Sequence, residues 1–179
     1  MKLSESAGYW REIGIHTHHR LSLGSPRSVQ LQVAALVGDH SIVASWSAYT
    51  SSGPSRWAVV AVTDDGRLIH VEMEFDVAEY DRDAEAQLHR QRQQVTVVVH
   101  DASARRLSEA VSLSFGGVSQ RFDRFDRPSR DQVDVSDVRL RFPDGSEIDL
   151  GIDQSSIHDS DDRARSDELI QAIRSHAGL

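Results

Sequence analysis

The chain has 179 residues, a length typical of one domain that buries a hydrophobic core. Its formal net charge of −8 disfavours general binding to nucleic acid or to an anionic membrane, because both modes need a basic surface. The chain contains no cysteine, which excludes disulfides, thiolate nucleophiles and cysteine-based metal sites.

Residues 1–25 show no sustained hydrophobic period, so we predict a flexible N-terminal arm with at most one short strand. Residues 26–179 are expected to form a single domain. Over residues 26–37 the apolar side chains fall at helical spacing, with Ser25 as the predicted N-cap, a proline at the first helical position and Gly38 as the stop. This pattern predicts a short helix.

After residue 40 the hydrophobic period changes from 3.6 to two, which indicates strands. Seven strands are predicted, at residues 42–49, 57–63, 69–76, 95–100, 111–115, 138–142 and 148–152. We expect Gly116 and Gly117 to end the fifth of them. Two polar segments, 78–94 and 120–132, are predicted to be insertions, and the first is either a long loop or a surface helix.

The tail from Ser160 onward is predicted to be a helix. Acidic residues lie toward its N-terminus, basic residues lie toward its C-terminus, and Gly178 follows, as the helix dipole and the preferred stop residue require. Leu169, Ile170 and Ile173 form an apolar stripe along it. This stripe is wide enough to dock on a sheet.

The order of short strands followed by one terminal helix, with an early hairpin over Trp57–His70, resembles the bacterial pleckstrin-homology-like domains over residues 40–178. The resemblance implies a mainly β (α+β) fold: a bent antiparallel sandwich or partly open barrel of about seven strands, with one open end plugged by the C-terminal helix. It also implies a binding or assembly module that is not an enzyme, and it assigns no catalytic residue. A closed antiparallel barrel with a ligand cavity is the competing architecture.

One segment combines arginine at every third position with two phenylalanines and interleaved aspartates. The candidate partner-binding residues in it are Arg121, Phe122, Arg124, Phe125, Arg127 and Arg130. Guanidinium groups would grip an acidic partner or a phosphate while the aromatic rings pack or stack. The competing interpretation is a solvated connection or an edge strand, because the aspartates cancel much of the charge and arginine supplies 19 of the 20 basic residues throughout this chain.

A second cluster is formed by His16, His18 and His19. On an extended chain, His16 and His18 would project from the same face, and imidazole is a common ligand for zinc or copper. A structural site needs four protein ligands and a catalytic one about three, and the sequence supplies no fixed further ligand. A solvated arm is the alternative, and we predict neither a metal nor a cofactor.

The sequence contains no Gly-x-Ser-x-Gly elbow and no phosphate-binding Gly-x-x-x-x-Gly-Lys loop. We therefore expect a non-enzymatic cytoplasmic module that acts through a protein partner or through self-assembly. No apolar run approaches the roughly 18 residues of a spanning helix, and the N-terminus lacks a secretory signal. The alternative function is a small-ligand carrier or enzyme on a closed barrel, with Trp46, Trp57 and Phe75 lining its cavity. In the first interpretation these two tryptophans, like Trp10, belong to the core.

Overall fold

The computed structural model describes residues 3, 6–19, 24–51, 53–91, 96–122, 127–153, 157 and 159–179. Its helices are α1 (Ala7–Thr17), α2 (Arg27–Val37), α3 (Arg82–Arg90) and α4 (Ser160–Ala177), with a short 3-10 turn η1 (Leu107–Glu109). Its strands are β1 (Ile42–Thr50), β2 (Ser55–Thr63), β3 (Arg67–Phe75), β4 (Val97–Arg106), β5 (Ser112–Phe122), β6 (Pro128–Arg141) and β7 (Glu147–Asp149).

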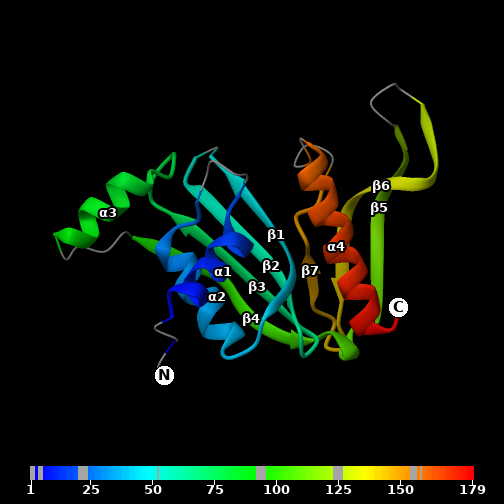
Figure 1. Ribbon diagram of the computed structural model, residues 1–179, viewed down its shortest axis with the longest axis horizontal. Coiled ribbons are helices and arrows are strands. Elements are labelled where there is room, and N and C mark those ends of the chain that lie inside the picture. The colour runs from blue at the N-terminus through cyan, green and yellow to red at the C-terminus, as the bar shows by residue number, and fades with distance from the viewer. Residues whose placement is uncertain are drawn as a thin grey trace.

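The described strands form two antiparallel sheets, one in the order β1-β2-β3-β4 and the other in the order β5-β6-β7. Figure 1 shows the four-stranded sheet in the middle of the molecule, with α1 and α2 on one side and α4 with β5–β7 on the other. The predicted mainly β, seven-stranded open sandwich with a C-terminal helix is therefore confirmed. The competing closed barrel is wrong, because the two sheets remain separate and open.

The four-stranded sheet has an apolar core on each face, because successive residues of a strand point to opposite sides. On the side of α1 and α2, Trp57, Val59 and Val71 are buried against the two helices. On the side of α4 and the second sheet, Val60 and Val62 belong to a separate cluster. Trp46 lies in that second cluster. Trp46 and Trp57 are thus core residues on opposite faces of the sheet, and they do not line one common cavity.

Helix α4 closes the second core, as its apolar stripe predicts. Leu169 and Ile173 are fully buried, and Ile170 is buried beside them. At its start the Asp159 carboxylate accepts hydrogen bonds from the backbone N–H groups of the second and third residues after it, each at 2.9 Å. At its end Gly178 adopts the left-handed conformation of a helix stop. Among the described residues, no helix is both long and apolar enough to cross a membrane.

The N-terminal segment differs from the expected arm, because its residues 7–17 form helix α1. Ile13 and Thr17, one helical turn apart, are buried against the sheet, and the Trp57 indole N–H donates to the Thr17 carbonyl at 3.1 Å. Gly14 destabilises the helix by about 1 kcal/mol. The packing of Ile13 and Thr17 against the sheet offsets this loss. Helix α2 also begins one residue later than expected, with Pro26 at the N-cap position.

Strand β5 continues through the two glycines that were expected to end it. A side chain at position 116 would meet the Asp137 Cβ at 2.6 Å, and one at position 117 would meet the Ser136 Oγ at 2.5 Å. Asp137 itself has a positive φ of 51°, which marks a local distortion of β6. The glycines therefore let β5 pass close to this distortion instead of breaking the strand.

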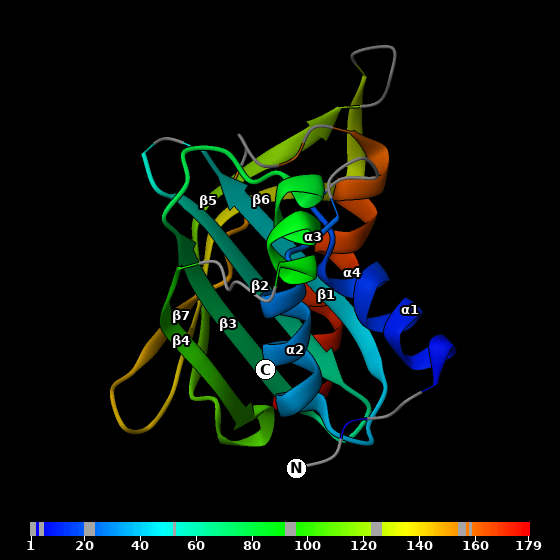
Figure 2. The same cartoon turned by 90° about the vertical axis from the view of Figure 1, so that its left-hand side faces the viewer.

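The two polar segments also acquire regular structure. Residues 82–90 form α3, which matches the surface-helix alternative for the first insertion. The second was expected to separate two hairpins, and instead β5 and β6 extend into it and pair as far as Phe122 and Pro128. The paired strands project beyond the N-terminal end of α4 (Figures 1 and 2). The predicted fourth strand begins at Val97 and runs on to Arg106, and its first expected residue, Val95, lies outside the described residues.

Candidate protein-interaction surface

The predicted partner-binding residues lie on or next to the hairpin formed by β5 and β6. Arg121 and Phe122 are the last residues of β5, Arg127 precedes β6, and Arg130 belongs to β6. The remaining two, Arg124 and Phe125, lie outside the described residues. Arg127 is exposed to solvent. Among the described positions, the spacing of three residues places Arg121 on β5, Arg127 just before β6 and Arg130 on β6.

Arg121 ties the hairpin to helix α4 and does not point freely into solvent. Its Nε lies 2.7 Å from an Asp134 carboxylate oxygen on β6, and its two terminal nitrogens lie 2.8 and 3.0 Å from the Asp167 carboxylate on α4. Its Nη2 also donates to the Val133 carbonyl at 3.1 Å. The hydrogen bonds to Asp167 and Asp134 raise the pKa of Arg121. The acidic partner predicted for this arginine thus comes from the same chain.

Two surface grooves flank this ion-pair bridge. The first has a volume of about 460 Å³ and is lined by Phe122 and Ile157, with Asp134 and Arg163 among its polar residues. Arg163 Nε lies 4.0 Å from an Asp134 oxygen. This groove therefore combines apolar surface with charges of both signs.

The second groove has a volume of about 290 Å³. Its lining includes Phe115 and Val133 from the hairpin and Ile170, Asp167 and Arg174 from α4. The Arg174 guanidinium carbon lies 5.5 Å from the centroid of the Phe115 ring, a cation–π distance. Each groove contains one of the two carboxylates that Arg121 binds, Asp134 in the first and Asp167 in the second.

The hairpin also exposes large apolar side chains. The exposed fractions are 63% for Val118, 52% for Phe122 and 50% for Val133. β5 carries no charged side chain from Ser112 to Gln120 and pairs with β6 on one side only. An uncharged strand at a sheet edge, next to exposed apolar residues, is a natural place for another polypeptide to bind.

The histidine cluster does not form the extended arrangement that a metal site would require. His16 lies in α1, where its Nδ1 is 2.9 Å from the Ser45 hydroxyl. Burial lowers the pKa of the His16 imidazole, and Glu12 opposes this effect. His18 Nδ1 contacts the Ile15 carbonyl, and His19 Nδ1 lies 3.0 Å from the Ser47 carbonyl. The rings of His16 and His19 thus dock the end of α1 against β1, whereas the His18 ring contacts its own helix.

A different cluster, formed by His40, Asp64 and Asp65, has the spacing of metal ligands. The two imidazole nitrogens lie 3.0 and 3.4 Å from the two carboxylates. Arg67 already occupies both oxygens of Asp65, at 2.8 and 3.1 Å. A guanidinium at this position would repel a cation, so the cluster is better explained by the Arg67–Asp65 ion pair and the contacts of His40 with Asp64 and Asp65, which stabilise the β2–β3 turn.

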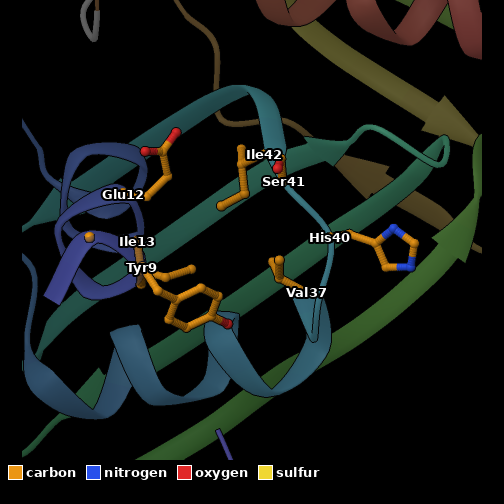
Figure 3. Close-up of a pocket in the computed structure, with 8 residues that line it drawn as sticks. Tyr9, Glu12, Ile13, Val37, His40, Ser41 and Ile42 are labelled. Carbon is orange, nitrogen blue, oxygen red and sulfur yellow. The ribbon is translucent and has the colours of Figure 1, made fainter. Parts of the chain in front are cut away.

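A small hollow lies between α1, the end of α2 and the start of β1 (Figure 3). Its volume is about 200 Å³, below the roughly 300 Å³ of a typical ligand pocket. The Tyr9 hydroxyl donates toward the carbonyls of Ala34 and Gly38, each at 3.2 Å, and so satisfies the end of α2. Figure 3 shows His40 pointing away from the hollow. The Tyr9 hydroxyl is thus already used at the end of α2.

A catalytic triad consists of serine, histidine and aspartate, and these three types meet at His70, Asp101 and Ser103. The hydrogen bonds between them, however, connect the residues in a different order. His70 Nδ1 lies 2.7 Å from Asp101 Oδ2, and the Ser103 hydroxyl donates to that same oxygen at 3.3 Å. A triad needs the serine bonded to the imidazole. These three residues therefore join β3 to β4 without forming a nucleophile–base pair.

No family model, curated protein or solved structure matches this chain.

The sequence did not identify the acidic and apolar residues that complete the surface. Asp134 and Asp167 are separated from Arg121 by 13 and 46 residues, and no local pattern connects them. One usable signal was present: the run from Ser112 to Gln120 is uncharged in a chain with 27% charged residues. Edge strands usually carry charges that oppose pairing with another strand, and this run carries none.

Proposed function

We propose that this chain is a non-enzymatic, cytoplasmic protein-interaction module of the pleckstrin-homology-like type. Its binding surface would be the β5–β6 hairpin together with the two grooves beside α4. The partner would be a polypeptide that places apolar side chains in the grooves and pairs its own charges with the charged groove residues.

One observation carries this proposal: Arg121 ties the hairpin to α4 while the apolar side chains of the hairpin stay exposed. Arg121 has a side chain only 13% exposed and binds two carboxylates from two different elements. Val118, Phe122 and Val133 on the same hairpin remain at least half exposed. Exposed apolar residues on a well-fixed scaffold lose little conformational entropy when a partner covers them. This combination favours binding.

The charges in the grooves indicate what kind of partner fits. The first groove contains Asp134 and Arg163, and the second contains Asp167 and Arg174. Each groove thus has one acidic and one basic residue, so the surface is not basic. With a net charge of −8, the chain repels a phosphate backbone. A protein segment with apolar residues and mixed charges is complementary to such grooves, and mixed charges of this kind give specificity more than affinity.

The test compares two double variants that remove equal numbers of exposed apolar side chains. Phe122→Ser/Val133→Ser changes the hairpin, and Val98→Ser/Val99→Ser changes β4, where both valines are also exposed. Each tagged protein is incubated with lysate of the source cells, and retained proteins are quantified by mass spectrometry. We expect at least one protein to be retained by the wild type and by the β4 variant but lost from the hairpin variant. Retention of the same proteins by all three would show that the hairpin is not the binding surface.

A further inference from the structure

The edges of the two sheets differ in how well they are protected against pairing with another strand. Unpaired edges invite strand addition, and proteins usually protect them with charges, distortions, short strands or covering segments. The described strands leave four edges, on β1, β4, β5 and β7. Three of these edges carry such protection.

The edge of β1 is covered by the segment after α1: the Ser47 hydroxyl donates to the His18 carbonyl, and His19 lies against the Ser47 carbonyl. β4 carries charged residues, including Asp101 and Arg105, and its pairing with β3 contains an irregularity. β7 is only three residues long. These edges are poor templates for a further strand.

The edge of β5 has none of these protections from Ser112 to Gln120, and its pairing with β6 becomes irregular only beyond Gln120. The strand has 11 residues, contains neither proline nor lysine, and is uncharged from Ser112 to Gln120. Its one charged residue, Arg121, is neutralised within the chain by Asp134 and Asp167. β5 also lies on the outer side of the smaller sheet, away from the four-stranded sheet (Figure 1). Among the described strands, none pairs with this edge, so a second chain can add a strand here.

The charge of the chain limits where another copy can bind, and the uncharged edge of β5 meets this limit. Two copies, each with a net charge of −8, repel each other over most orientations. They can meet where the local charge is zero, and the nine-residue uncharged run offers such a stretch on both copies at once. Two copies of one strand pair in antiparallel fashion when a two-fold axis relates them. Such an isologous contact uses the same surface of each copy. Val118 lies next to the middle of β5, so two exposed valines would lie close to that axis.

We propose that two copies of this chain pair through β5, antiparallel about a two-fold axis at Val118, and form one continuous six-stranded sheet. The inference rests on the proposed function and deepens it, because it names the occupant of one edge of the same hairpin. The contact is closed, since each copy uses its only unprotected long edge in the described part of the chain. A dimer is therefore expected and not a fibre.

The test uses the purified full chain and sedimentation velocity over a range of protein concentrations. We expect the wild type to form a dimer, and Val118→Lys to raise its dissociation constant by about tenfold or more, because a charge on an edge strand opposes pairing. Val98→Lys, at a valine 50% exposed on β4, is the matched control and should dimerise like the wild type. A wild type that is monomeric at every concentration overturns the inference. So does a dimer that is broken by Val98→Lys and not by Val118→Lys.

A second measurement does not depend on how well the lysine variant folds. Because the chain has no cysteine, Val118→Cys introduces a single thiol. Facing residues of paired strands have Cα atoms about 4.5–5.5 Å apart, within reach of a disulfide. Oxidation should link Val118→Cys, but not Val98→Cys, into covalent dimers, and equal cross-linking of both would overturn the inference. Failure here is distinct from failure of the proposed function: a monomeric chain that still captures another protein through Phe122 and Val133 rejects only the self-pairing.

Discussion

Replacing Arg121 with glutamine should destabilise the chain by loosening the hairpin from α4. Glutamine keeps much of the side-chain length but removes the charge and most of the five N–H donors. The substitution breaks the ion pairs with Asp134 and Asp167. It also leaves the Asp134 carboxylate, only 19% exposed, without its closest cation.

The two ion pairs should contribute unequally. Between Arg121 and Asp134 both side chains are mostly buried, and a hydrogen bond between charged groups in such a position is worth about 1.5–3 kcal/mol. Asp167 is half exposed, so its pair should add no more than about 0.5 kcal/mol. We expect Arg121→Gln to lower the free energy of unfolding by about 2–3 kcal/mol, and the thermal midpoint of a chain of this size by about 4–12 °C.

Urea unfolding followed by circular dichroism measures this loss. The matched control is Arg139→Gln in the same sheet, where arginine and its partner Glu147 are both about half exposed. This control should lose less than about 0.5 kcal/mol. Asp134→Asn combined with Arg121→Gln should cost clearly less than the sum of the two single changes. An Arg121→Gln protein as stable as the control, or strict additivity in the double variant, would refute the assignment of Arg121 as the bridge between hairpin and helix.

Three further predictions concern the helices. Leu169→Ala should lower the free energy of unfolding by about 2–5 kcal/mol in urea titrations, since Leu169 is fully buried between α4 and the sheets; a loss below about 1 kcal/mol would contradict this packing. Asp159→Ala should cost about 1 kcal/mol because it removes the N-cap of α4, and Asp159→Asn should restore most of that loss. Burial lowers the pKa of the His16 imidazole in the folded chain. The contribution of His16 to stability is therefore complete above the ordinary histidine pKa of about 6.5, and it is lost as the pH falls through the lower pKa of the folded chain. His16→Asn should therefore make stability less dependent on pH below neutrality, and an unchanged dependence would argue against a buried imidazole.

Local periodicity was sufficient to predict the elements that depend on neighbours in the sequence. The alternation in β3 places Ile69, Val71 and Met73 on one face, and the stripe of α4 is visible within the helix itself. Helix α1 could not be predicted in this way, because it contains two glycines and buries few residues. Its stability comes from contacts with β1 and from the bond between Thr17 and Trp57, which are tertiary.

The candidate surface was only partly predictable for the same reason. The sequence indicated Arg121 and Phe122 as residues of interest, but it suggested an external acidic partner for the arginine. Its actual partners include Asp167, on an element 46 residues away. The path of β5 through Gly117 likewise depends on the close approach of Ser136 from the next strand. Contacts of this range have no counterpart in the pattern of a single chain.

The two cores on opposite faces of the four-stranded sheet give the β2–β3 turn an influence beyond its size. β2 sends Trp57 and Val59 to one core and Val60 and Val62 to the other. A slip of one residue in strand pairing moves every side chain to the opposite face. Such a slip in β2 would exchange the contents of both cores at once, and it would place the indole ring of Trp57 at the site of Arg56 or Ala58. Residues 64–66, which close this hairpin, therefore determine how the whole chain divides its apolar side chains between its two interiors.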